Sequence, residues 1–175
     1  MRIYEGSPRQ DFEEVLRSIG AFLDRRGMHE VLLAEAPDGF ILQGLVRSSE
    51  GVGGWSEAMG HETKETLTFL DDDISRFMDE AVARRGTETP AVDWASGGYY
   101  EKAFRVLGRY MDEQRPRDVF FFEQEGAFVV RLLMASQTGS RHVLAEFTKD
   151  DIEAMVAHGP SLRNIGSTKA GSVGG

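Results

Sequence analysis

The chain has 175 residues, with 41% hydrophobic and 28% charged residues, and a formal net charge of −9. It contains no cysteine, which excludes disulfides, thiolate zinc sites, iron–sulfur clusters and cysteine nucleophiles. An acidic body repels phosphate backbones, so we expect no nucleic-acid partner, and no apolar run reaches the roughly 18–20 residues that span a bilayer.

The first predicted element is a helix. Ser7-Pro8-Arg9-Gln10 is typical of a helix start, with proline at the first helical position. Apolar residues then recur at helical spacing: Phe12, Val15, Leu16, Ile19, Phe22 and Leu23. Gly27 is placed to end the helix with a positive φ. Glu13 and Arg17 have the spacing of an i,i+4 ion pair, which we expect on the solvent side.

Two strands and a hairpin turn follow. Residues 31–35 and 40–46 are apolar runs of strand length, separated by the turn signal Pro37-Asp38-Gly39. Residues 31–33 do not alternate between apolar and polar, so we expect both faces of this hairpin to be partly covered, within the chain or in a homodimer. A third strand near residues 65–70 leads into a helix at Asp71-Asp72-Asp73, where carboxylates suit the first helical turn better than a metal site.

The loop before the third strand is the best candidate for a functional segment. Residues 51–62 are rich in glycine and contain Trp55, Glu57, His61 and Glu62. Loops of this length are often functional. In one interpretation Trp55 contacts a ligand, and the other three residues are acid/base or metal groups. In the other, the loop is flexible and its tryptophan folds back onto the core. The four histidines form no metal-binding spacing, so we expect neither a metal nor a catalytic set.

A second unit repeats the first. Residues 12–48 and 100–136 align without a gap at an offset of 88, with nine identical pairs in 37 positions. The pairs are Glu13/Glu101, Arg17/Arg105, Gly20/Gly108, Asp24/Asp112, Val31/Val119, Glu35/Glu123, Phe40/Phe128, Leu45/Leu133 and Ser48/Ser136. At an offset of 78, four of the six residues 69–74 are identical to their counterparts in 147–152, so the first unit has ten extra residues in its loop. These pairs are Phe69/Phe147, Asp72/Asp150, Asp73/Asp151 and Ile74/Ile152. This pattern indicates a tandem duplication.

The repeated mid-helix glycines, Gly20 and Gly108, predict a close approach of each helix to a neighbour, because glycine otherwise costs about 1 kcal/mol in a helix. The second unit ends its helix at Pro116 and has strands at residues 119–123 and 128–134, with a turn at Glu125-Gly126. A third strand at 142–148 and a closing helix complete it.

The predicted organisation is a first repeat at 1–86, a linker at 87–98, a second repeat at 99–160 and a flexible C-terminal tail at 161–175. Trp94 either pins the linker to a core or is exposed to a partner. The tail is small, polar and weakly basic. Its candidate binding residues are Leu162, Arg163, Ile165 and Lys169.

The predicted fold class is α+β, a tandem duplication of an α-β-β-β-α unit with antiparallel sheets and helices packed on one face. This unit order is similar to that of double-stranded-RNA-binding domains. The basic residues which those domains place at their second helix are aspartates here, so RNA binding does not follow. The same order is similar to the first part of small acidic secretion chaperones, which bind partner segments as dimers.

We therefore predict a cytoplasmic, non-enzymatic protein-binding, adaptor or chaperone-like protein without a cofactor or membrane insertion. It would act through an apolar sheet face, the Trp55 loop and the tail, and could form a homodimer. One alternative is a subunit of a larger assembly, held by its tail. Another is a small-ligand-binding protein or enzyme, with a site between the repeats near Trp55, Glu57 and His61.

Overall fold

The computed structural model describes residues 12–47, 62–85, 97–137, 139–158 and 171–173. The elements are α1 (Phe12–Arg26), β1 (Met28–Ala36), β2 (Gly39–Arg47), β3 (Glu62–Leu70), α2 (Asp71–Arg85), α3 (Tyr99–Gln114), β4 (Asp118–Gln124), β5 (Ala127–Ser136), β6 (Gly139–Phe147), α4 (Lys149–His158) and β7 (Gly171–Val173). The α+β class is therefore confirmed. Within these ranges, no helix combines the length and the apolar character needed to cross a membrane.

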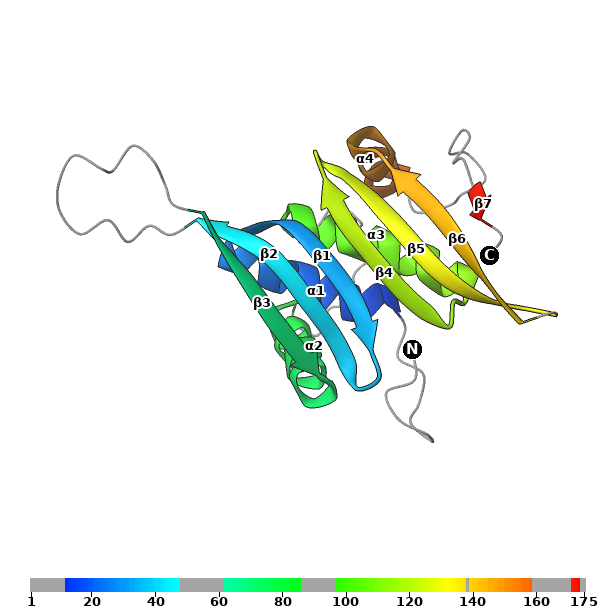
Figure 1. Cartoon of the computed structure of the whole chain (residues 1–175). Coiled ribbons are helices and arrows are strands. Elements are labelled where there is room, and N and C mark those ends of the chain that lie inside the picture. Colours follow the sequence, from blue (N-terminus) through cyan, green and yellow to red (C-terminus); the bar gives the residue numbers. More distant parts are fainter. Residues whose placement is uncertain (1–11, 48–61, 86–96, 138, 159–170, 174–175) are drawn as a thin grey trace, which may run out of the picture.

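The strands form one continuous antiparallel sheet in the order β3-β2-β1-β4-β5-β6-β7 (Figure 1). The two predicted units meet edge to edge through β1 and β4. Their junction is short, because Leu32, Leu33 and Ala34 pair with residues 122, 121 and 120 in turn. The second unit thus extends the sheet of the first. Of the two expected ways of covering the second face of the first hairpin, the second unit therefore does not supply one, and the homodimer stays a prediction.

Buried and partly exposed residues alternate along the central strands. On β1, Val31 and Leu33 are fully buried, whereas Leu32 and Ala34 are partly exposed. The side that carries the buried residues defines the inner face, and the opposite side defines the outer face. Helices α1 and α3 lie behind the sheet in Figure 1, against the inner face. Aromatic rings join helices to that face: Phe104 to Phe121, Tyr110 to Phe147, and Phe22 and Phe77 to Phe69.

Two glycines lie at close contacts between helices α1 and α3. A Cβ atom on Gly20 would lie 2.3 Å from the carbonyl oxygen of Tyr100, and one on Gly108 would lie 2.5 Å from that of Phe12. Real Cβ atoms do not come this close to backbone atoms, so only glycine fits. The predicted close approach is confirmed. The two contacts are equivalent, because Gly20 corresponds to Gly108 and Phe12 corresponds to Tyr100 at the offset of 88.

The repeated glutamates and arginines pair between the two helices. Arg17 is only 3% exposed, and its Nε donates to Glu101 Oε1 at 3.0 Å. Arg105 is also buried, and its Nε donates to Glu13 Oε1 at 3.3 Å. We predicted that Arg17 pairs with Glu13 on the solvent side; instead it is buried and pairs with Glu101 of the other helix. Both arginines face the neighbouring helix, beside the glycines that let it approach.

Each of these helices is also capped by the other. The carboxylate of Asp112 accepts hydrogen bonds from the backbone N–H groups of Phe12 and Glu13, at 2.8 and 3.0 Å. Asp24 accepts from Tyr100 and Glu101, at 3.0 and 2.9 Å. The first N–H groups of a helix have no partner within it, so the aspartates satisfy them from outside. The predicted capping box at residues 7–10 lies outside the described residues.

We expect Asp24→Ala and Asp112→Ala each to lower the free energy of unfolding by about 1–2 kcal/mol, the usual cost of losing a helix cap. Urea denaturation monitored by circular dichroism measures the loss. Asp79→Ala is the matched control, because Asp79 is exposed on α2. A loss no larger than that of the control would contradict the capping role.

Local caps and turns agree with the sequence. At the start of α2, Asp73 accepts from the N–H of Leu70 at 3.2 Å. At α4, Asp151 accepts from the N–H of Thr148 at 2.9 Å, and the threonine hydroxyl accepts from the N–H of Asp151 at 3.2 Å. The interpretation of the Asp71-Asp72-Asp73 run as a helix start is therefore confirmed through Asp73, and Asp151 has the same role at α4. Gly27 has the predicted positive φ, 68°.

Part of the predicted tail belongs to the sheet. Residues 171–173 form β7, which pairs with β6 from His142 to Leu144. This part of the tail is therefore a strand and not free chain.

Candidate functional site

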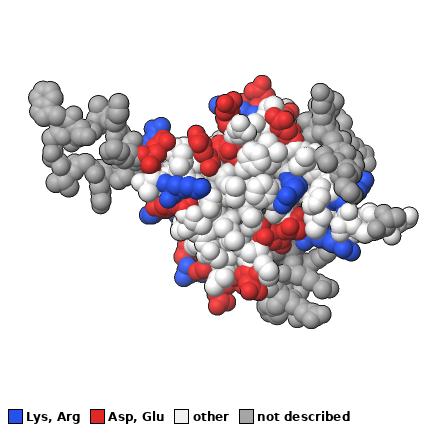
Figure 2. Space-filling model, in the orientation of Figure 1, with Lys and Arg blue, Asp and Glu red and all other residues white. Residues whose placement is uncertain are grey.

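The outer face carries apolar side chains across the centre of the sheet. They come from β1, β2, β4, β5 and β6: Leu32, Ala34, Ile41, Leu45, Phe120, Phe122, Val129, Leu133 and Leu144. Ile41 is 39% exposed, and the others are partly exposed. Figure 2 shows this side of the molecule, where charged side chains surround an uncharged area and some basic ones extend onto it. Arg131, between Val129 and Leu133 on β5, also belongs to this face and is exposed. Contiguous apolar surface of this kind often marks an interaction site.

A bulge in β1 interrupts this face. The register between β1 and β2 shifts between His29 and Leu32, and Glu30 has a φ of 49°. Bulges bend a strand and are frequent beside functional sites. The pairing of β1 with β4 ends at Leu32 and Phe122, next to the bulge. The two strands diverge beyond this point.

Side chains replace the missing strand pairing. The N–H of Val31 donates to Glu123 Oε2 at 3.3 Å, and the hydroxyl of Tyr100 donates to the same oxygen at 2.7 Å. The backbone of Glu30 hydrogen-bonds to the Tyr100 hydroxyl. Burial and the bond to the Glu123 carboxylate raise the pKa of Tyr100 above its usual range. The bulge is thus held in place from the helix side.

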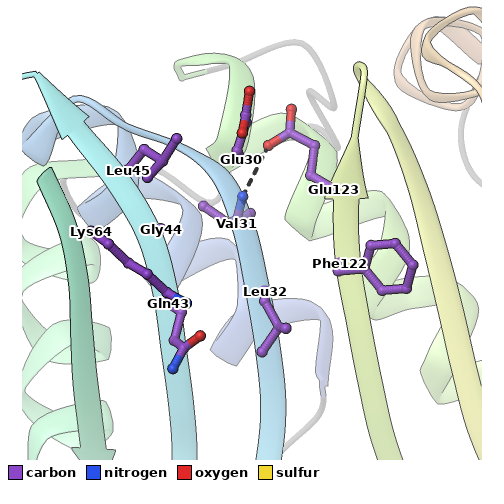
Figure 3. A pocket seen from close by; sticks show the side chains of 9 residues that line it. All are labelled: Glu30, Val31, Leu32, Gln43, Gly44, Leu45, Lys64, Phe122 and Glu123. Carbon is purple, nitrogen blue, oxygen red and sulfur yellow. Dashed lines mark hydrogen bonds between the residues drawn. The ribbon is translucent and has the colours of Figure 1, made fainter. Parts of the chain in front are cut away.

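A cavity of about 310 Å³ opens beside the bulge. Its lining residues are Glu30, Val31, Leu32, Gln43, Gly44, Leu45, Lys64, Phe122 and Glu123. In Figure 3, Glu30 and Glu123 lie together where β1 and β4 part, and Lys64 reaches from β3 toward Gln43. The cavity therefore has carboxylates on one side, an amine and an amide on the other, and apolar groups such as Leu32 between them.

The other end of the β1–β4 junction has an equivalent carboxylate in a different environment. At the offset of 88, Glu35 corresponds to Glu123, and Val119 corresponds to Val31. The backbone of Val119 hydrogen-bonds to Glu35, as the backbone of Val31 does to Glu123. Where the second unit has Tyr100, the first has Phe12, which has no hydroxyl. Oε2 of Glu35 is buried without a hydrogen-bond partner among the described residues. Burial raises the pKa of Glu35 to about 7, and the charge of Asp118 adds to this.

Only one of the site residues predicted from the sequence lies in the described part of the chain. Glu62 is exposed at the start of β3, where its Oε1 lies 3.1 Å from His29 Nε2 and 3.5 Å from Arg47 Nε. It does not line the cavity. The remaining predictions fall outside the described residues: Trp55, Glu57, His61, Trp94, Leu162, Arg163, Ile165 and Lys169.

Sequence reasoning missed the residues of the cavity. The identity of Glu123 with Glu35 at the offset of 88 was a usable signal, because it lies at a strand end in both units. Nothing marked Glu30, Gln43 or Lys64. Among the described residues, no three acidic or histidine side chains are grouped so that they could hold a metal ion.

No protein-family model, curated protein or solved structure matches this chain. The outer face and the cavity are therefore the features from which a function can be inferred.

Proposed function

We propose that this chain is a non-enzymatic protein-binding protein, of adaptor or chaperone type, whose outer face binds an apolar segment of a different protein. The observation that carries the proposal is the run of apolar side chains across β2, β1, β4 and β5, on a face that no described helix covers. Fully burying one large apolar side chain contributes about 1.5–3 kcal/mol. These side chains are already partly buried, so a partner gains less than this from each of them and must cover several together to bind specifically.

The charge of the chain favours a different protein over a second copy as the occupant. Each chain has a formal net charge of −9, so two copies repel each other over their whole surfaces. A partner segment with basic residues is attracted instead, both by the net charge and by acidic side chains beside the apolar centre, such as Glu30 and Glu123.

The internal symmetry also supports this choice. We infer that the two units arose by tandem duplication, because the glycine contacts, ion pairs and caps between α1 and α3 all recur at the offset of 88. The pairing of β1 with β4 is symmetric in the same way, because Leu33 pairs with Phe121, its own equivalent at the offset of 88. One chain therefore already contains the arrangement that two single units would form as a dimer, and a second copy is not needed to complete it.

A site-specific cross-linking experiment tests the proposal. A photoreactive phenylalanine analogue is placed at Ile41, on the outer face, and for comparison at Asp79, on exposed α2. In the native cell, we expect the Ile41 probe to capture a defined partner that the Asp79 probe does not capture. Leu133→Asp, which adds a charge to the outer face, should reduce that capture at least tenfold.

Two results would contradict the proposal. Equal capture from Ile41 and Asp79 would show that the outer face has no special role. Capture of only a second copy of the chain from Ile41, with a dimer in light scattering that Leu133→Asp dissociates, would make the outer face a homodimer interface. The roles predicted for the Trp55 loop and for the tail remain predictions.

A further inference from the structure

Each residue of the cavity except Lys64 has an equivalent at the offset of 88, so the cavity has a counterpart at the other end of the β1–β4 junction. Leu32 and Gln43 lie opposite each other on β1 and β2, and they correspond to Phe120 and Arg131, opposite each other on β4 and β5. The guanidinium carbon of Arg131 lies 5.0 Å from the centroid of the Phe120 ring. The second unit therefore places a cation of its own on the outer face, where the first unit has a neutral amide.

The acidic residues of the two places correspond as well. Glu30 and Glu123 beside the cavity are equivalent to Asp118 and Glu35 at the offset of 88. Glu123 uses Oε2 for its bonds to the backbone of Val31 and to a tyrosine hydroxyl. Among the ion pairs of the described residues, none joins a cation to Glu30 or Glu123. The first unit thus keeps the carboxylates and has a neutral amide at the position of Arg131, while its own cation at the cavity, Lys64, lies on the side away from them.

We propose that this cavity receives the guanidinium of an arginine side chain from the partner protein, and so fixes where the partner segment docks on the outer face. This inference rests on the proposed function. Arginine suits the cavity better than lysine, because its planar group has five donors and is more weakly hydrated than an ammonium. A guanidinium between Glu30 and Glu123 leaves its aliphatic stem along Leu32 and Leu45.

The opposite side of the cavity suits the backbone of the same segment. Lys64 and the amide of Gln43 can donate hydrogen bonds to its carbonyl oxygens. Lys64 is a cation, so it attracts carbonyl oxygens and repels a guanidinium. The guanidinium is therefore favoured on the other side of the cavity, beside the carboxylates. A volume of about 310 Å³ lies at the lower end of the range for ligand sites, as expected for one side chain.

Titration of the full chain with N-acetyl-arginine-N′-methylamide, followed by ¹H–¹⁵N NMR, tests the cavity directly. We expect shifts of the backbone amides of Glu30, Leu32, Gly44 and Glu123, with a Kd of about 1–10 mM. The matching citrulline compound has the same shape without the charge and should bind at least tenfold more weakly. Equal responses to the two compounds, or shifts elsewhere only, would overturn the inference.

Gln43→Arg provides the sharpest variant, because it gives the first unit the residue that the second unit has. We expect it to reduce binding of the arginine compound at least tenfold. Gln137→Arg adds the same charge at an exposed turn and should change the affinity by less than twofold. Glu30→Gln, at an exposed side chain, should weaken binding about fivefold. Unchanged binding in Gln43→Arg, with a folded spectrum, would overturn the inference.

The same variants separate this inference from the proposed function. If the partner supplies the arginine, Gln43→Arg should lower capture by the Ile41 probe, and Gln137→Arg should not. Undiminished capture in Gln43→Arg would refute the arginine site and leave the proposed function in place. Binding of the arginine compound without any capture at Ile41 would point to a free guanidinium compound as the ligand and would refute a protein source.

Discussion

Gly20→Ala and Gly108→Ala should each lower the free energy of unfolding by about 2 kcal/mol, although alanine is the better helix former by about 1 kcal/mol. The new methyl group would lie 2.3 Å from a carbonyl oxygen in the first variant and 2.5 Å in the second. Backbone atoms of a neighbouring helix cannot move aside as a side chain can, so α1 and α3 must separate. Urea denaturation followed by circular dichroism measures the effect.

The double variant gives a stricter test. Once one alanine has moved the helices apart, the second meets less resistance, so the combined loss should be clearly smaller than the sum. Gly27→Asn is the control, because Gly27 has a positive φ that asparagine tolerates and no atom lies within 4 Å of its added Cβ. It should cost less than 1 kcal/mol. Strictly additive losses, or a stabilised Gly20→Ala, would contradict the tight contact.

Glu35→Gln should stabilise the protein at pH 8 by up to about 3 kcal/mol and leave it nearly unchanged at pH 4. The pKa of Glu35 rises from 4.5 to about 7 on folding, mainly because of burial. Between these values the unfolded chain releases a proton that the folded protein keeps, so the free energy of unfolding falls as the pH rises. Below pH 4.5 both states are protonated, and the full stability is present.

Two further variants test the cause of this shift. Phe12→Tyr gives the first unit the hydroxyl with which Tyr100 bonds to Glu123 at 2.7 Å. This donor favours the charged form, so it should lower the pKa of Glu35 and increase stability at pH 8 relative to pH 4. Tyr100→Phe should destabilise the protein, because Glu123 loses a bond from a buried donor. The pKa is read by NMR from the side-chain carboxyl carbon. A value for Glu35 near 4.5 in the wild type would contradict the prediction.

Much of the fold could be predicted from local signals. The helix stripe from Phe12 to Leu23, the turn at Gly39 and the cap at Asp73 are all properties of neighbouring residues, and each was in its predicted place. The identical pairs at the offset of 88 also marked the residues that join the two units. Their roles were harder to assign, because Arg17 at i,i+4 from Glu13 gives the same spacing whether it pairs within or between helices.

The site was much less predictable. Its cavity depends on a bulge at Glu30 and on the divergence of β1 from β4, which is fixed by contacts between residues about 90 positions apart in the chain. No local pattern encodes these contacts. The candidates drawn from unusual composition, such as the loop with Trp55, lie outside the described residues. The absence of alternation in residues 31–33 was a real signal, but it reflected an apolar outer face and not a layer formed by the second unit.

The exchange of helix caps also limits when this protein can fold as it leaves the ribosome. Domains generally fold from the N-terminus as they emerge. In the first helix, Gly20, the buried Arg17 and the N–H groups of Phe12 and Glu13 all have their contact partners on α3. The cap of α1 is Asp112, so the first half cannot complete its structure until the chain has been made past that residue. Its apolar sheet and helix surfaces must stay exposed, or be held by a chaperone, for most of synthesis.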